Sequence, residues 1–147
     1  MARTYRLSFA RRLVNIVAIF LLRAGVKIST TCLLIVRGRK TGRLHTIPVT
    51  LVEQDGRRWL VAPYGAVNWV HNARAAEHVM LSRGRRTETV ELIELGAADA
   101  APILKHYLKR IFVVRPFFDV TVRSSLEAFE REAPRHPVFL IVERNRK

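Results

Sequence analysis

Short apolar runs separated by turn residues fill most of the chain after residue 27. β-Branched and aromatic residues are frequent in these runs, and several alternate between apolar and polar positions, which is typical of strands. Six such runs predict strands, at residues 28–36, 46–52, 59–62, 78–83, 86–95 and 137–142. Asp55-Gly56 predicts a tight hairpin turn between the second and third strands, and Gly84 predicts another between the fourth and fifth.

Three longer connections carry apolar residues at helical spacing instead. Residues 68–76 predict a short helix with Asn68 as its N-cap, and residues 97–111 predict a longer helix. Ser124 with Glu127 resembles a capping box, which predicts a third helix that ends near residue 132. Six strands joined by tight turns, with helices in the longer connections, predict an α+β fold that is mainly β: a small antiparallel barrel decorated by helices.

The first 26 residues differ from the rest of the chain. Four arginines within residues 3–12 precede the apolar run 13–22, which is shorter than the roughly 20 apolar residues of a membrane span. Arg23 stands where a signal-peptide cleavage site would be expected, which argues against a cleaved leader. We therefore predict an N-terminal amphipathic helix over residues 1–26, docked on the domain or lying at a membrane surface, and one barrel domain over residues 27–147.

Charge, cysteine and histidine content narrow the class of protein. The 147 residues fit one domain, and 26 Lys and Arg against 12 Asp and Glu give a net charge of +14, so attraction to polyanions is expected. The net charge alone does not show whether the binding partner is a nucleic acid, a membrane surface or an acidic small ligand. Cys32 is the only cysteine and lies in an apolar run, which predicts a core residue in a protein of the reducing cytoplasm. The five histidines lack the spacing of a zinc or iron site, so no metal site is predicted.

Between the first two predicted strands lies the segment Gly38-Arg39-Lys40-Thr41-Gly42-Arg43. Glycines let the backbone approach an oxyanion closely, while the cations neutralise the charge and the hydroxyl donates a hydrogen bond. A Walker loop requires the lysine after the second glycine, whereas here the lysine precedes it, so a nucleoside triphosphate site of that kind is excluded. The segment is therefore a candidate phosphate clamp, and the alternative is a solvated basic hairpin turn.

The order of these features resembles one known family. An apolar N-terminal helix, a strand, the cationic loop, a strand with Pro48, an Asp-Gly hairpin, and then Trp69 and Asn72 after a glycine-containing loop are similar to the deazaflavin-dependent nitroreductases. These proteins are F420-binding split β-barrel oxidoreductases of actinobacteria. The resemblance covers residues 28–94 and extends more loosely to the last predicted strand. It implies that the predicted barrel is a split β-barrel.

The resemblance also implies a function and a site. In this family reduced F420 delivers hydride from its deazaflavin ring to a lipophilic organic acceptor such as a quinone, an enone or a nitroaromatic compound. The phosphate and oligoglutamate tail of F420 are anionic, which gives the basic loop a chemical purpose. Residues 62–65 would lie against the ring, and the aromatic and amide side chains that follow would shape the pocket wall. The implied cofactor-binding residues are Gly38, Arg39, Lys40, Thr41, Gly42, Arg43, His45, Pro48, Ala62, Pro63, Gly65, Trp69 and Asn72.

Three departures from the family pattern bear on the site. His45 stands where members often have an arginine, which makes this phosphate contact weaker or dependent on pH. A serine common near Pro63 is absent, and residues 115–118 read Arg-Pro-Phe-Phe where nitro-reducing members carry tyrosines. Phe117 and Phe118 either suit a lipophilic acceptor such as a quinone or belong to the core, so the acceptor stays open.

A proton donor is needed near the acceptor, because charge develops on the acceptor oxygen during hydride transfer. Tyr64, His71 and Tyr107 have suitable side chains. Tyr64 is the candidate catalytic residue because it stands in the loop expected to face the ring. The alternative is that Tyr64 only closes a turn beside Gly65.

Other functions compete with this reductase. FMN also carries a phosphate, so FMN is the alternative cofactor on the same barrel. A non-catalytic lipid- or fatty-acid-binding split-barrel protein at the membrane would use the N-terminal helix with Phe117 and Phe118. A nucleic-acid-binding module is disfavoured, because the aromatics are not interleaved with the cations and no DNA-binding motif is evident.

The expected partner is a small lipophilic electron acceptor. The expected location is the cytoplasm, either free in it or associated with the inner face of the cell membrane through the N-terminal helix. A monomer and a dimer of barrels would leave the same sequence pattern, so the oligomeric state is not predicted.

Overall fold

The computed structural model describes residues 31–144, so the predicted amphipathic helix over residues 1–26 lies outside the described residues. The strands in this part of the chain are β1 (Thr31–Arg37), β2 (Leu44–Gln54), β3 (Arg57–Val61), β4 (Val79–Arg83), β5 (Arg86–Glu94) and β6 (Val138–Glu143). The helices are α2 (Asn68–Ala75), α3 (Ala97–Arg110) and α4 (Leu126–Glu132), with short 3-10 helices η1 (Phe112–Phe117) and η2 (Ala133–Arg135). None of the helices within residues 31–144 has the length and apolar content to cross a membrane.

The strands close into one barrel in the order β1-β2-β3-β6-β5-β4, and each strand is antiparallel to both neighbours. This confirms the predicted antiparallel barrel of about six strands. Asp55 and Gly56 have φ angles of 53° and 75°, the left-handed pair that a type I′ hairpin turn requires. Gly84, with φ 63°, makes the turn between β4 and β5. Both hairpins were predicted from these residues, because turn chemistry is local.

Two helix caps differ from prediction. Val67 occupies the N-cap position of α2, and Asn68 is the first helical residue without a capping hydrogen bond. The turn before α2 explains the shift, because Val67 N donates to Gly65 O at 2.9 Å and Val67 O accepts from Val70 N at 3.0 Å. At α4 the N-cap is Ser125, whose hydroxyl accepts from Ala128 N at 3.2 Å. The predicted capping box is therefore wrong by one residue.

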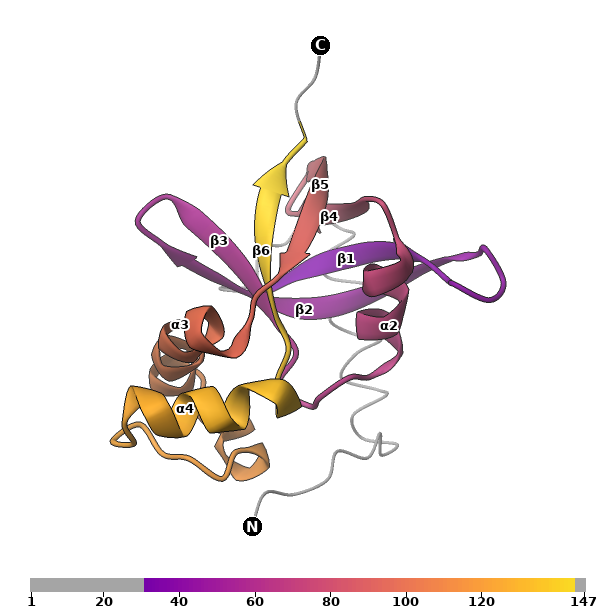
Figure 1. The fold of residues 1–147 in the computed structure, drawn as a ribbon. Helices are drawn as coiled ribbons and strands as arrows, with labels where there is room; N and C mark the ends of the chain where they lie inside the picture. The colour runs from indigo at the N-terminus through magenta and orange to yellow at the C-terminus, as the bar shows by residue number, and fades with distance from the viewer. Residues whose placement is uncertain (1–30, 145–147) are drawn as a thin grey trace.

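Strand alternation divides the apolar residues into two cores. Leu34, Leu51 and Leu60 face one cluster, which also contains Trp69 and Val70 of α2. On β2 and β3 the residues next to Leu51 and Leu60 point to the other face of the sheet, where they pack in a second cluster with α3 and α4. The second cluster includes Val52, Trp59, Val61, Leu104, Tyr107, Phe129 and Val138. The sheet is thus buried on both faces where α3 and α4 cover it, and Figure 1 shows these two helices side by side against the barrel.

The helix α2 lies apart from α3 and α4. Figure 1 shows it beside the β1–β2 connection, which projects from the barrel on the same side. Trp69 and Val70 anchor α2 because they are 8% and 0% exposed in the barrel core. This anchoring brings residues of α2 next to the cationic loop.

Candidate functional site

The β1–β2 loop, residues 38–43, is closed by its own backbone. Gly38 N donates to Arg43 O at 2.7 Å, and Gly42 N donates to Gly38 O at 2.9 Å. Gly42 has a φ of 74°, in the left-handed region that favours glycine. Thr41 Oγ1 accepts from Arg43 N at 3.2 Å, which leaves the threonine hydroxyl proton available to an acceptor. The loop is therefore an ordered turn with cationic side chains on its surface.

Gly38 is needed because side chains approach it closely. A Cβ at this position would lie 2.8 Å from His45 Nε2 and 3.0 Å from Thr41 Oγ1. His45 follows the loop on β2, directly opposite Val36 of β1. The absence of a side chain at residue 38 thus lets the imidazole and the hydroxyl converge on the loop backbone.

Arg39 and Asn72 are joined across the gap between the loop and α2. The Asn72 amide oxygen accepts from Arg39 N at 3.1 Å and from Arg39 Nη1 at 2.7 Å. Asn72 is 6% exposed, so its oxygen requires such a partner. Sequence reasoning placed Asn72 at the cofactor pocket, whereas it did not predict the hydrogen bonds to Arg39.

A cavity of about 450 Å³ lies between this loop, the start of β2 and α2. Its walls are made by Gly38, Arg39, Lys40, Thr41, His45, Thr46, Ile47, Asn68, Trp69 and Asn72. Seven of these ten residues are among the predicted cofactor-binding residues. The three that were not predicted are Thr46 and Ile47, which lie between His45 and Pro48 on β2, and Asn68, which precedes Trp69 on α2.

The other predicted residues lie outside this wall. Gly42 and Arg43 belong to the same loop, and Pro48 is half-buried on β2 opposite Leu33. Ala62 is 1% exposed in the barrel core, so only its backbone could meet a ligand without rearrangement. Pro63, Tyr64 and Gly65 are half-buried in the connection from β3 to α2. Their assignment as ligand-binding residues stays a prediction.

The three candidate proton donors have different environments. The Tyr64 ring packs edge-on against Phe117, with ring centroids 4.8 Å apart. His71 is exposed on α2. Tyr107 is 1% exposed in the second core, and burial raises its pKa above the usual value. Because a buried tyrosine is inaccessible to an acceptor, Tyr64 stays the candidate donor and Tyr107 belongs to the core.

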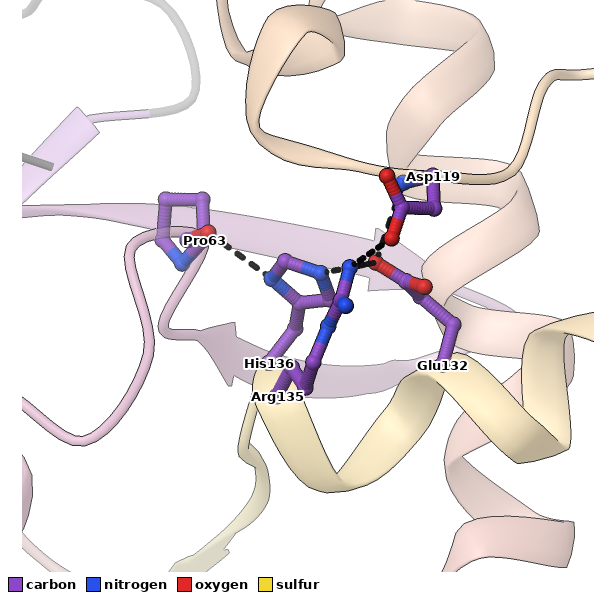
Figure 2. Close-up of polar contacts among 5 residues, drawn as sticks. All are labelled: Pro63, Asp119, Glu132, Arg135 and His136. Atoms are coloured by element: carbon purple, nitrogen blue, oxygen red, sulfur yellow. Dashed lines mark hydrogen bonds and ion pairs between the residues drawn. The ribbon is translucent and has the colours of Figure 1, made fainter. Parts of the chain in front are cut away.

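A second polar cluster lies on the far side of the β3–α2 connection, and sequence reasoning did not find it. Figure 2 shows the His136 ring between the Pro63 carbonyl and the Glu132 carboxylate, with the side chains of Arg135 and Asp119 close to that carboxylate. His136 Nδ1 lies 2.8 Å from Pro63 O, and its Nε2 lies 2.6 Å from Glu132 Oε2. Burial lowers the pKa of His136, while its hydrogen bonds to Glu132 and Pro63 act in the opposite direction.

The sequence offered only a weak signal for this cluster. Glu132 and His136 are four residues apart, but a 3-10 turn separates them at the end of α4, so helical spacing does not pair them. Within residues 31–144 no group of three or more His, Cys, Asp and Glu side chains could hold a metal ion.

The closed antiparallel barrel of six strands, with α3 and α4 on one flank, has the fold of the split β-barrel class. The chain belongs to the F420H2-dependent quinone reductase family, which matches residues 10–114. It is therefore an F420-dependent oxidoreductase, as the resemblance implied. Family membership does not favour the alternatives of an FMN-dependent enzyme or a lipid carrier.

Three solved structures are similar to this chain, and the two with TM-scores above 0.5 share its fold. A structure of an F420-H2 dependent reductase, FDR-A, is 21% identical, covering 77% of this chain and 94% of its own, with a TM-score of 0.48. A domain-swapped dimer is 19% identical over 91% of this chain and 99% of its own, with a TM-score of 0.51. A protein of unknown function from Agrobacterium tumefaciens is 14% identical over 90% of this chain and 56% of its own, with a TM-score of 0.58. No curated protein matches the chain in sequence.

Proposed function

We propose that this reductase binds F420 in the cavity between the β1–β2 loop and α2 and reduces a lipophilic acceptor of the quinone type. The proposed cofactor site is supported by the composition of the cavity wall, where the cations of the loop and the Trp69 indole of α2 lie together. A cavity of about 450 Å³ is in the usual range for small-molecule sites. Reduced F420, when bound there, supplies the hydride.

The residues of the wall fit the anionic part of the cofactor. Lys40 is exposed at the cavity and offers an ammonium to a phosphate or carboxylate. Arg39 presents a guanidinium whose position is set by Asn72. Thr41 adds a hydroxyl, and the unsubstituted Gly38 allows a close backbone approach. These groups bind and orient the anion, and the bound anion then fixes the position of the rest of the cofactor.

The wall also offers an apolar surface. Trp69 lines the cavity and packs on Phe139 with ring centroids 5.9 Å apart, so the indole is held by the core. A fixed aromatic side chain provides a rigid surface for a ring system and keeps water away from it. We assign Tyr64 as the group that holds the proton for the acceptor oxygen, since it lies in the connection that leads into α2.

The acceptor is inferred from chemistry around Tyr64. Phe117 is half-buried against Tyr64, whereas Phe118 is 6% exposed and stacked on His136, so only Phe117 is placed to face a substrate. An apolar aromatic neighbour favours a lipophilic acceptor, and the family to which the chain belongs is one of quinone reductases. A quinone is accordingly the proposed acceptor class.

The test is a titration with F420 followed by tryptophan fluorescence, with FMN in parallel. Lys40→Ala should weaken F420 binding by about tenfold or more, which corresponds to about 1.4 kcal/mol. Arg85→Ala is the matched control, because it removes the same charge from the exposed β4–β5 turn. Its affinity should stay within about twofold of the original.

Three results would contradict the proposal. Absence of saturable F420 binding would remove the cofactor site, and equal weakening by both substitutions would show only non-specific attraction to a basic protein. Turnover of nitroaromatic compounds but not of short-chain quinones, with F420H2 as reductant, would overturn the acceptor class.

A further inference from the structure

The connection from β3 to α2 is held from the side opposite the cavity. Ala62 N donates to Pro137 O at 2.8 Å, and Pro63 O faces His136 Nδ1 at 2.8 Å. Gly65 lies against the same segment, since a Cβ there would be 3.4 Å from Arg135 O. Residues 135–137 therefore run alongside residues 62–65, and His136 contributes the side-chain contact between them.

The His136 ring is held by two hydrogen bonds, and each requires a proton between the two atoms that it joins. A carbonyl oxygen only accepts, so Nδ1 must carry the proton shared with Pro63 O. The 2.6 Å between Nε2 and Glu132 Oε2 also requires a proton, because two lone pairs at that distance would repel. The orientation of the imidazole is thus set from both ends, as Figure 2 shows.

Glu132 is held in turn by two further groups. Its Oε2 accepts from Asp119 N at 3.2 Å and from Arg135 Nη2 at 3.0 Å, and Arg135 Nη2 also contacts Asp119 Oδ2 at 2.6 Å. Glu132 and His136 are 6% and 3% exposed. Buried charged pairs often add little net stability compared with apolar packing, so folding alone gives weak reason for this pair.

The aromatic neighbours extend the contact to Tyr64. Phe118 stacks on His136 at 3.7 Å with ring planes 10° apart. The preceding residue, Phe117, meets the Tyr64 ring edge-on. The connection is therefore held at its backbone by His136 and at the Tyr64 ring by Phe117.

We propose that His136, oriented by Glu132, is a positioning residue that fixes residues 62–65 and, through them, Tyr64. The catalytic consequence rests on the proposed function, because it assumes that Tyr64 acts on the acceptor. The positioning of the backbone does not rest on it. His136 meets the candidate site at the Pro63 carbonyl, and it acts on Tyr64 through that contact.

Two substitutions test the contact with Pro63 and the contact with Glu132 separately. The amide of His136→Asn reaches the place of Nδ1 and can still donate to Pro63 O, whereas the amide of His136→Gln extends toward Glu132 and loses Pro63. Ser125→Ala is the control, because it removes the N-cap hydrogen bond of α4 without touching Pro63. Glu132→Gln, an isosteric change, serves as a second variant if His136→Gln does not fold.

The first readout is amide hydrogen exchange at Gly65 and Val67, whose N–H groups bond within the connection. His136→Gln, or Glu132→Gln, should accelerate this exchange by about tenfold, His136→Asn by less than about threefold, and Ser125→Ala only as far as it lowers global stability. Unchanged exchange in His136→Gln, or equal acceleration in Ser125→Ala, would overturn the positioning role.

The second readout is steady-state kinetics with F420H2 and a quinone. His136→Gln should lower kcat by about tenfold while the Kd for F420 stays within about twofold, because the cavity wall is not altered. Faster exchange with unchanged kcat would overturn the catalytic consequence. If the unsubstituted protein does not bind F420, the proposed function fails, and the exchange experiment still decides whether His136 positions the connection.

Discussion

Asn72 shows how one buried side chain controls a charged one. Its amide oxygen accepts both the backbone N–H and the guanidinium of Arg39, 33 residues away in the sequence. An arginine side chain free to rotate loses about 2 kcal/mol of conformational entropy when it is fixed by a ligand. Because Asn72 fixes Arg39 before any ligand arrives, part of that cost falls on folding instead of binding.

Replacing Asn72 by Leu should therefore weaken F420 binding. We expect the Kd to rise by roughly tenfold, because Arg39 loses its anchor while its charge remains. Tryptophan fluorescence measures the change. Arg74→Gln, on the exposed side of the same helix, removes the ion pair with Glu94 and should leave the Kd within about twofold. An unchanged Kd in Asn72→Leu would mean that Arg39 needs no anchor.

Cys32 offers a prediction from burial alone. The thiol is 2% exposed in the barrel core, and this burial raises its pKa from 9.0 to about 12. The native thiolate fraction at pH 8 should then be about a thousandfold below that of the unfolded chain. Alkylation by iodoacetamide should be correspondingly slow in the folded protein and fast in concentrated urea. Rapid alkylation of the folded protein would show that β1 opens locally.

At the scale of elements, the β1–β2 hairpin combines rigidity with an open surface. Its register continues to the pair Arg37 and Leu44, after which the loop closes on its own hydrogen bonds. Arg37 Nη1 also donates to Gly42 O at 2.7 Å, which ties the loop to the strand below it. Strand pairing thus fixes where the cations of the loop stand relative to α2.

Gly42→Ala should test the strain in this loop. The φ of 74° at Gly42 disfavours any side chain, although a Cβ at this position would have no atom within 4 Å. We expect a loss of about 1 kcal/mol in the free energy of unfolding, measured by urea denaturation. Lys40→Ala, at an exposed position of the same loop whose φ is not positive, should cost less than about 0.5 kcal/mol. Equal losses in the two variants would argue against strain at Gly42.

At the scale of the whole molecule, the two cores share the strands of one barrel. β2 and β3 send Leu51 and Leu60 to the barrel interior and Val52, Trp59 and Val61 to the layer under α3 and α4. Separation of these strands would open both cores at once, because β2 and β3 contribute side chains to each. The cavity and the Glu132–His136 pair, one on each flank, are therefore built on a common scaffold.

This shared scaffold predicts cooperative unfolding. Trp59 reports on the helical flank and Trp69 on the barrel interior, so each can be followed alone in the Trp69→Phe and Trp59→Phe variants. In each variant the urea midpoint by fluorescence should coincide with the midpoint by circular dichroism, as in two-state unfolding. An earlier transition for Trp59 would show that α3 and α4 detach before the barrel unfolds.

The barrel was predictable because its signals are local. Alternation places strands, and Asp55-Gly56 requires backbone angles that few other pairs adopt, so neighbours in the sequence carry enough information. Caps were less predictable. Ser124 and Ser125 are chemically equal candidates, but in the fold the Ser124 hydroxyl accepts from Thr121 N, and Ser125 caps the helix.

The candidate site likewise has a part that the sequence predicts and a part that only the tertiary structure brings together. Its cations and glycines are contiguous, so composition and spacing alone marked residues 38–43 as a candidate anion-binding loop. The partners of Arg39 and Pro63 lie 33 and 73 residues away, and no periodicity links such positions. Barrel closure and the packing of α2 and α4 bring them together, because a buried polar atom must find its partner wherever the folded backbone places one.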